Sequence, residues 1–510
     1  MRKKWFRIVF RQRVFVILLL LLQVVLMTLT VYSSSRTYRW IHYALYLISA
    51  LVILHVISTG KKSSYKLIWA VTILIFPLFG GLLYLFVYLQ TISPEFKKNY
   101  QAAEQRINAF LKSNEDSYRL LEKTVPEQLN QAFYLTKSCG FSAFENSEAE
   151  YLTPGEEKFL RLKEILSEAK DFIFLEYFIV TEGTMWTQIL EILKQKATAG
   201  VDVRLIYDDL GCFMKLPADY QKKLESLGIK CRVFNKFRPA LSTLQNNRDH
   251  RKIAVVDGKW AITGGINIGD EYINKTSPLG HWKDASILIR GEAANGFTAM
   301  FLTMWQTLTG ETEDISAFLN NPQEEPAQHD GFVIPYSDCP MDSEYTGEQV
   351  YMNMINGAKR YLYIQTPYLI IDDNMLSALT LAAKNGVDVR IITPGIPDKS
   401  YVHLTTRSYY RELMRGGVLI YEYTPGFLHS KVIVSDDTVA TVGSINLDFR
   451  SLYLHFECGA WLLKSKVITD IKEDFLNTLR VCRQITEKDC RVGFIKKLVQ
   501  NIFRLLAPLM

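Results

Sequence analysis

The chain has few cysteines, and their spacing excludes several kinds of site. Seven cysteines are scattered over 510 residues, and no two of them form a Cys-x-x-Cys pair. A zinc ribbon and a thioredoxin-like redox centre both need such pairs, so we expect neither. An odd, scattered set also differs from the disulfide framework of a small secreted protein, and it fits free thiols.

Several catalytic signatures are also absent. There is no Gly-x-x-x-x-Gly-Lys-Ser/Thr loop for nucleoside triphosphates and no Gly-x-Ser-x-Gly elbow of a serine hydrolase. The chain also lacks a large excess of one sign of charge, because its formal net charge is only +6 at pH 7. This mild basicity is compatible with an anionic membrane surface, and it gives little support for nucleic acid as a partner.

Apolar residues are abundant, and they are concentrated near the N-terminus. The mean hydropathy is +0.02, and three apolar runs cover residues 14–32, 40–57 and 67–89. Each run is close to the ~20 residues that cross a hydrocarbon core. The sequence therefore predicts a transmembrane region over residues 1–90. Buried core helices are one alternative, and a cleaved signal peptide is an alternative for the first run.

The basic residues around these runs predict an orientation. Six positive charges precede Val14, which favours a cytoplasmic N-terminus. Three complete crossings would then place the large C-terminal region on the outer face. A run that enters and leaves on the same side would reverse this assignment.

Beyond residue 130 the pattern changes to short strands that alternate with amphipathic helices, which indicates an α/β fold. A strand, a helix and a second strand that begins with Gly-Val-Asp-Val-Arg occur in this order twice. The first set covers residues 172–178, 185–198 and 201–207, and the second covers residues 361–365, 374–384 and 387–392. We interpret this as two copies of one domain packed face to face.

The composition between these segments predicts the domain boundaries. We expect a linker at 91–130, a first domain at 131–325, a second at 326–490 and a basic amphipathic segment at 491–510. That C-terminal segment fits a helix in a membrane interface, and it fits equally a helix packed on the second domain.

Each copy contains the same polar motif. It reads His-x-Lys-x4-Asp, and an asparagine follows ten positions after the aspartate. The residues are His250, Lys252, Asp257 and Asn267 in the first copy and His429, Lys431, Asp436 and Asn446 in the second. The residues after each lysine are β-branched or small and predict a strand, on which positions i and i+2 point to one face. Each histidine and its lysine therefore face one cleft.

Small residues stand two positions before each asparagine. They are Gly265 in Gly-Gly-Ile-Asn and Ser444 in Gly-Ser-Ile-Asn. Such residues allow a ligand to approach the backbone closely, and the asparagine amide supplies an N–H donor at the same place. Two histidines and two lysines around one anionic phosphate are a nucleophile and an acid beside donors for the phosphoryl oxygens.

The paired motifs resemble those of the phospholipase D superfamily, and the longer strings around them resemble bacterial cardiolipin synthases. These strings are residues 247–272 and 426–451, and the run 64–84 is similar to a membrane helix of that family. The resemblance extends over about residues 40–510. The family usually has two N-terminal membrane helices, and this chain has a third apolar run before them.

The resemblance implies an α/β fold with duplicated phospholipase D-like domains, related by a pseudo-twofold axis and preceded by transmembrane helices. It also implies a multi-pass protein of a bacterial cell membrane. The implied activity is transfer of a phosphatidyl group between two phosphatidylglycerol molecules, which yields cardiolipin and glycerol. Membrane phospholipids are then the partners, nucleic acid is not one, and no cofactor or metal is needed because lysines supply the positive charge.

The resemblance also implies a role for each site residue. His250 attacks phosphorus and forms a phosphatidyl-histidine, and His429 acts as acid and base, although the symmetric motifs allow the reverse assignment. Glu457 resembles the acidic residue that orients a catalytic histidine, and Asp284 is its counterpart in the other copy. The lysines and asparagines of the motifs stabilise the phosphoryl oxygens, Gly265 and Ser444 lie at the substrate, and Asp257 and Asp436 complete the motifs with a structural or orienting role.

Three other functions use the same residues or the same fold. A phospholipase D-type hydrolase would take water as the acceptor, a membrane-bound nuclease would need a more basic face, and a non-catalytic lipid-binding protein would lose part of the motif. All four motif histidines and lysines are present. The Asp-Gly-x2-Ala-Arg signature of enzymes that use CDP-linked lipids is absent, which argues against that route to cardiolipin.

Overall fold

The computed structural model of the chain describes residues 36–88, 94–111, 115–236, 243–319 and 330–509, and positions 18, 21, 23–25 and 28 of the first apolar run. The rest of that run, predicted at 14–32, lies outside the described residues. The chain divides into two compact units. The larger unit comprises residues 94–236 and 247–500, and the smaller comprises residues 1–93, 237–246 and 501–510.

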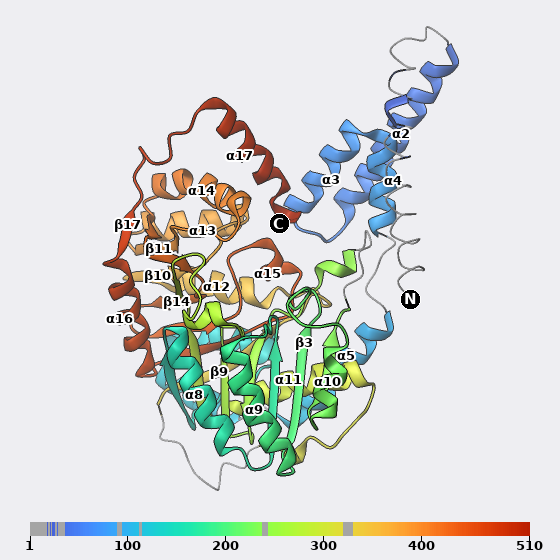
Figure 1. Ribbon diagram of the computed structural model, residues 1–510. Helices are drawn as coiled ribbons and strands as arrows, with labels where there is room; N and C mark the ends of the chain where they lie inside the picture. Colours follow the sequence, from blue (N-terminus) through green and yellow to red (C-terminus); the bar gives the residue numbers. More distant parts are fainter. Residues whose placement is uncertain are drawn as a thin grey trace. The chain divides into compact units, whose positions relative to one another are not determined.

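The larger unit is built on two mixed β-sheets whose strands follow the same order (Figure 1). The first sheet runs β1 (Ser147–Leu152), β8 (Ser286–Gly291), β6 (Trp260–Gly264), β5 (Lys252–Val256), β2 (Phe172–Tyr177), β3 (Asp202–Asp208) and β4 (Lys230–Phe234). The second runs β9 (Phe332–Asp338), β16 (Glu457–Leu463), β15 (Val439–Gly443), β14 (Val432–Ser435), β10 (Tyr361–Gln365), β11 (Asp388–Pro394), β12 (Leu419–Tyr423) and β17 (Cys482–Gln484). Apart from β17, each strand has a counterpart, so the duplication predicted from the sequence is confirmed.

Helices cover both sheets. Those of the first copy are α8 (Gly155–Glu168), α9 (Thr184–Thr198), α10 (Tyr220–Ser226) and α11 (Ala294–Thr309). Those of the second copy are α12 (Thr346–Gly357), α13 (Asp373–Lys384), α14 (Ser400–Arg415), α15 (Phe449–Tyr453) and α16 (Val467–Leu479). Helix α17 (Phe494–Leu506) follows them, and the boundary between the two units falls within it. Short helical turns lie at Pro126–Gln128, Tyr134–Ser138, Thr243–Asn246, Asp270–Ile273, Ser316–Phe318 and Ala507–Leu509.

The central strands owe their position to largely apolar sequence, in which Glu176 of β2 and Gln365 of β10 are the polar residues. Every residue of β2 and of β10 is buried, as expected for strands with a parallel neighbour and covered faces. Helix α11 is buried from Ala294 to Thr307. Within the segment predicted as a linker, α5 (Pro94–Phe110) packs against α11 and buries Tyr100, Ala103 and Ile107. The same segment holds α6 (Glu115–Thr124) and α7 (Leu129–Phe133).

Two parallel backbone pairings join the copies. Strand β7 (His281–Lys283) pairs with β13 (Gly426–Leu428), and Asp249 pairs with Phe456. In each pairing, a segment that leads into a motif histidine lies beside a segment of the other copy that leads into an acidic residue. These pairings bring the two copies together at the motifs.

The smaller unit contains α2 (Arg36–Ser58), α3 (Ser63–Ile75) and α4 (Pro77–Tyr88). The run at 67–89, predicted to cross a membrane in one pass, is instead a hairpin of two helices, because Trp69 of α3 stacks edge-on against Tyr84 of α4 at 5.2 Å. Pro77 has no N–H and begins the second helix. A Cβ on Gly80 would lie 2.7 Å from the carbonyl oxygen of Thr72, so only glycine permits this close packing.

A polar residue of the first apolar run supports the start of α4. The side-chain oxygen of Gln23 accepts hydrogen bonds from the N–H groups of Leu78 and Phe79, at 2.9 and 3.1 Å. These N–H groups lie in the first turn and have no partner within the helix. Among the helices that the structure describes, none has both the length and the apolar character needed to cross a bilayer.

Candidate active site

The two motif histidines stand directly before corresponding strands, β5 and β14, and both are 7% exposed. The backbone N–H of His250 donates to the carbonyl of Phe456 at 2.9 Å, and that of His429 donates to the carbonyl of Lys283 at 2.7 Å. Both bonds cross from one copy to the other. The position of each histidine therefore depends on the opposite copy.

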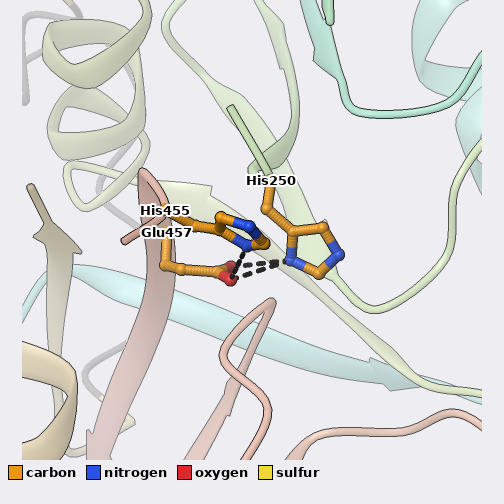
Figure 2. A group of neighbouring side chains, drawn as sticks. All are labelled: His250, His455 and Glu457. Atoms are coloured by element: carbon orange, nitrogen blue, oxygen red, sulfur yellow. Dashed lines mark hydrogen bonds and ion pairs between the residues drawn. The ribbon is translucent and has the colours of Figure 1, made fainter. Parts of the chain in front are cut away.

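Each imidazole is also held by a carboxylate of the other copy. Nδ1 of His250 lies 2.9 and 3.0 Å from the two carboxylate oxygens of Glu457, and Nδ1 of His429 lies 2.7 Å from Asp284 Oδ2. Figure 2 shows the His250 pair. A carboxylate at Nδ1 holds the proton there, which fixes the ring and leaves Nε2 to react. The structure thus brings together four residues predicted for the site.

The surroundings of the two carboxylates differ, and the difference explains two further predicted residues. The hydroxyl of Ser444 donates to Glu457. The corresponding residue in the first copy is Gly265, where a Cβ would lie closer to Asp284 Oδ1 than the 3.0 Å that real Cβ atoms respect. Asp284 is instead supported by the N–H of Ala285 at 2.8 Å. Ser444 and Gly265 therefore contact the orienting acids, where we had expected them to lie at the substrate.

A third histidine lies in the site, and the sequence analysis missed it. Nδ1 of His455 is 3.6 Å from Glu457 Oε1, and its ring centre is 5.4 Å from that of His250 (Figure 2). The corresponding residue in the other copy is Trp282, whose ring centre is 5.3 Å from that of His429. Both stand two residues before the orienting acid, and this shared offset was the available signal.

The group of His250, His455 and Glu457 has the residue types of a metal site, since its ligand atoms all lie within 4.8 Å of one another. The electrostatics oppose a divalent ion there. The buried ammonium groups of Lys252 and Lys431 both act on His250 and help to lower its pKa, and they would repel a second cation. We therefore favour proton chemistry for this group over metal binding.

The two motif lysines are buried: Lys252 is the first residue of β5, and Lys431 stands directly before β14. Each is 2% exposed, and each ammonium donates to the carbonyl of its own motif histidine. Burial lowers the pKa of Lys252 to about 8 and that of Lys431 to about 7. Two buried cations beside two histidines form a site whose charge is complementary to an anionic phosphoryl group.

The surroundings of both imidazoles disfavour their protonated forms, as the pKa shifts indicate. Burial first, and the neighbouring lysines second, lower the pKa of His250 well below 6.5. The same two causes lower the pKa of His429 to about 4, although Asp284 opposes the shift. The contact with His429 in turn holds the pKa of Asp284 below its usual range, against the effect of burial.

The two predicted asparagines are placed differently. Asn267 is fully engaged, because its Oδ1 accepts from the N–H of Ile179 at 3.0 Å and its Nδ2 donates to the hydroxyl of Tyr272 at 3.0 Å. The Oδ1 atom of Asn446 is buried and has no hydrogen-bond partner among the described residues. Asn446 therefore keeps one unused acceptor atom, whereas Asn267 ties its loop to Ile179 and Tyr272.

Asp257 and Asp436, predicted as motif members with a catalytic, structural or orienting role, do not reach the histidines. Each lies at the far end of its strand, roughly 20 Å from the histidine at 3.3 Å per residue. Asp257 accepts from the backbone N–H groups of Lys170, Asp171 and Phe172 at 2.8–2.9 Å. Asp436 makes the same three bonds to residues 359–361. Both therefore anchor the start of a central strand.

Comparison with known proteins agrees with this geometry. A family described as cardiolipin synthase, PLD-like domain, matches residues 162–305 and 351–479, one segment in each copy. A family described as phospholipase D-nuclease N-terminal matches residues 44–87. The crystal structure of phosphatidylserine synthase from Haemophilus influenzae shares the fold, with a TM-score of 0.54 and 15% identity over 71% of this chain and 95% of that one.

Two relatives align over most of their length. An uncharacterized protein of Streptococcus mutans is 42% identical over 459 residues, which is 90% of this chain and 99% of that protein. Cardiolipin synthase 2 of Bacillus anthracis is 37% identical over 459 residues, 88% of each chain. Fold and site therefore define a phosphatidyltransferase of the phospholipase D superfamily. Within that superfamily, the chain belongs to the cardiolipin synthases.

Proposed function

We propose that this enzyme makes cardiolipin and glycerol from two phosphatidylglycerol molecules through a covalent phosphatidyl-histidine on His250. The observation that carries the proposal is the pair of buried histidines, each held at Nδ1 by an acid of the opposite copy. One oriented imidazole serves as the nucleophile and the other as the proton donor and acceptor. Lys252 and Lys431 stabilise the negative charge on the phosphoryl oxygens.

The first half-reaction cleaves the donor lipid. Nε2 of His250 attacks phosphorus, and the bond from phosphorus to the glycerol headgroup oxygen breaks. His429, which takes up a proton at Nε2 when the anionic phosphate of the donor lipid binds beside it, delivers that proton to the departing oxygen. Free glycerol leaves and the phosphatidyl group remains on His250. The second half-reaction runs in reverse with a new alcohol. His429 removes the proton from a primary hydroxyl of a second phosphatidylglycerol, its oxygen attacks phosphorus, and the bond to Nε2 breaks.

The differences between the two copies favour His250 as the nucleophile. His429 makes the shorter contact with its acid, at 2.7 Å, and Asp284 has no other side-chain donor among the described contacts. That carboxylate is well placed to stabilise an imidazolium, as an acid requires. Glu457 shares its charge between His250, Ser444 and the nearby His455, so it stabilises a protonated His250 less and leaves a neutral nucleophile.

The central experiment uses purified enzyme, phosphatidylglycerol as the sole substrate, and a chelator. We expect cardiolipin and an equal amount of glycerol. Phosphatidic acid as the only product would identify a hydrolase, and a need for a CDP-linked lipid would exclude the histidine mechanism. His429→Ala should accumulate the phosphatidyl-enzyme from a donor with a good leaving group, and His250→Ala should not. The opposite pattern would exchange the two roles.

We further propose that residues 1–90 attach the enzyme to the membrane of a bacterial cell as a multi-pass segment, with α3 and α4 as a hairpin that enters and leaves on one side. The chain then leaves the hairpin on the side where Lys61, Lys62 and Lys66 lie, and the positive-inside rule makes this the cytoplasmic side. The orientation expected from three complete crossings is thereby reversed.

Labelling tests this orientation. Lys61→Cys and Lys384→Cys, both exposed positions, should react with a membrane-impermeant maleimide only after the cells are permeabilised. A chain without the added cysteines gives the background. Labelling of Lys384→Cys, but not of Lys61→Cys, in intact cells would restore the outer-face assignment.

A further inference from the structure

Helix α17, Phe494–Leu506, separates its apolar and polar residues more completely than its surroundings require. The apolar residues Phe494, Ile495, Leu498 and Ile502 lie within one half of the helical wheel at 100° per residue. Lysines, glutamine, asparagine and arginine occupy the other half. A helix of this kind, packed on a soluble domain, normally buries its apolar half and exposes its polar half.

Helix α17 does not follow this rule. Among residues 494–500 the buried one is polar: Gln500 is 6% exposed and donates from Nε2 to the carbonyl of Leu404 in α14 at 3.4 Å. Phe494 is 83% exposed, Ile495 77% and Leu498 49%. Gln500 therefore packs on the protein, whereas the apolar residues at 494, 495 and 498 face outward, and the flanking Lys496 and Lys497 are exposed beside them. Exposing three large apolar side chains to water is unfavourable, so this face implies a covering.

We infer that the apolar face of α17 inserts into the interface of a bilayer rich in anionic phospholipid. The helix carries three basic residues, Lys496, Lys497 and Arg504, and no acidic residue. Burial first, and then the charges of Arg407 and Lys496, lower the pKa of His403 of α14, so Lys496 brings positive charge to the junction of the two helices. An apolar stripe flanked by lysine and arginine matches an anionic surface, whose headgroups attract the basic side chains while the apolar side chains enter the acyl region.

This contact is independent of the chemistry at the histidines, and it adds a role for the enzyme's own substrate and product. Phosphatidylglycerol and cardiolipin are both anionic lipids. We expect the helix to bind a bilayer more strongly when the bilayer contains more anionic lipid. The position of the second domain at the membrane then depends on the lipids that the proposed reaction consumes and produces. The inference adds this regulation to the proposed function but does not require that function to be correct.

The test reports on one residue at a time, so attachment through the N-terminal region does not obscure it. An environment-sensitive fluorophore is placed on Ile495→Cys, on the apolar face, and on Lys497→Cys, on the polar face, in the full chain. The parent chain gives the background from native thiols. In vesicles that contain phosphatidylglycerol, we expect blue-shifted emission and quenching by nitroxide lipids at position 495 only. Both effects should weaken in vesicles of neutral lipid and at high salt.

A second pair of variants tests the same contact by its loss. Leu498→Glu places a charge on the exposed apolar face, and Asn501→Glu adds the same charge at the edge of the polar half. Leu498→Glu should abolish the blue shift at position 495 and raise KM on vesicles, with kcat in detergent micelles and the melting temperature unchanged. Asn501→Glu should retain most of the shift.

Three results would overturn the inference. The first is water-like emission at position 495 in anionic vesicles. The second is a shift that follows protein concentration and ignores lipid composition, which would identify a second copy of the chain as the covering partner. The third is a shift present in detergent-free, lipid-free protein, which would identify another segment of the same chain. Loss of cardiolipin synthesis with the lipid-dependent shift intact would refute the proposed function alone.

Discussion

Replacing Gly265 with serine should displace the carboxylate of Asp284, which orients His429, without straining the backbone. Gly265 does not have the positive φ that disfavours side chains, so only contact matters. The new Cβ would come closer than 3.0 Å to Asp284 Oδ1 and push the carboxylate away from its place. The 2.7 Å contact with His429 Nδ1 would then be lost. Since a misoriented general acid forfeits its contribution, we expect kcat to fall roughly 10²–10⁴-fold.

The opposite copy provides the matched control. Ser444→Gly removes one hydroxyl donor from Glu457 and introduces no atom. A hydrogen bond to a charged group contributes about 1.5–3 kcal/mol, and the two bonds between Glu457 and His250 remain, so the loss should be the smaller of the two. The double variant Gly265→Ser/Asp284→Glu copies the serine and glutamate pair of the second copy. It should regain at least part of the activity that Gly265→Ser loses.

The assay is the conversion of phosphatidylglycerol to cardiolipin in mixed micelles, with thermal melting as the test of folding. The reasoning is refuted if Gly265→Ser melts like the wild type and keeps full kcat. It is also refuted if the double variant is folded and no more active than Gly265→Ser. The serine and glutamate pair of the second copy would then be unable to replace the glycine and aspartate pair of the first.

Three further predictions concern stability. Burial lowers the pKa of His429 and of His455 to about 4, so between pH 6.5 and 4 the unfolded chain binds more protons than the folded one. Each histidine should therefore cost roughly 3 kcal/mol of folding stability as the pH falls from 7 to 4. In urea unfolding, the midpoint of His455→Asn should fall less over this pH range than that of the wild type. Asp257→Ala removes three hydrogen bonds to backbone N–H groups and should lower stability by about 1–3 kcal/mol, with kcat of the folded enzyme near normal; a large drop in kcat at unchanged melting temperature would contradict this. Gly80→Ala meets the backbone of α3, whereas Gly81→Ala meets nothing within 4 Å, so protease resistance in detergent should fall only for Gly80→Ala.

The duplication was predictable because the same local sequence pattern occurs twice in the chain. Strands with β-branched residues, amphipathic helices and a repeated Gly-Val-Asp-Val-Arg segment give the same order in both copies, and the two sheets follow it. The hairpin of α3 and α4 was not predicted, because hydropathy measures the length of an apolar run and does not show whether the chain turns back within it. Pro77 and Gly80 were the local signals for the turn and the close packing that follow.

The site was predictable in part, for a related reason. His250 and Lys252, like their counterparts, stand two positions apart where a strand begins, so the spacing alone predicts that they lie close together. The acids that orient the two histidines lie 207 and 145 positions away from them, and only the resemblance to a family pointed to these acids. That each acid serves the histidine of the opposite copy depends on how the sheets pack, which no local pattern encodes. His455 belongs to no motif, and its role is visible only beside Glu457.

The exchange of acids between the copies bears on how such a chain could arise. A single copy would hold a histidine without its carboxylate and a carboxylate without its histidine. Two identical copies related by a twofold axis would complete both pairs at once, as an isologous dimer does. The present chain is then such a dimer with its subunits joined end to end. Once joined, the halves were free to differ, and they do. Glu457 has Ser444 and His455 beside it where Asp284 has Gly265 and Trp282, a difference in line with the separate roles proposed for the two histidines.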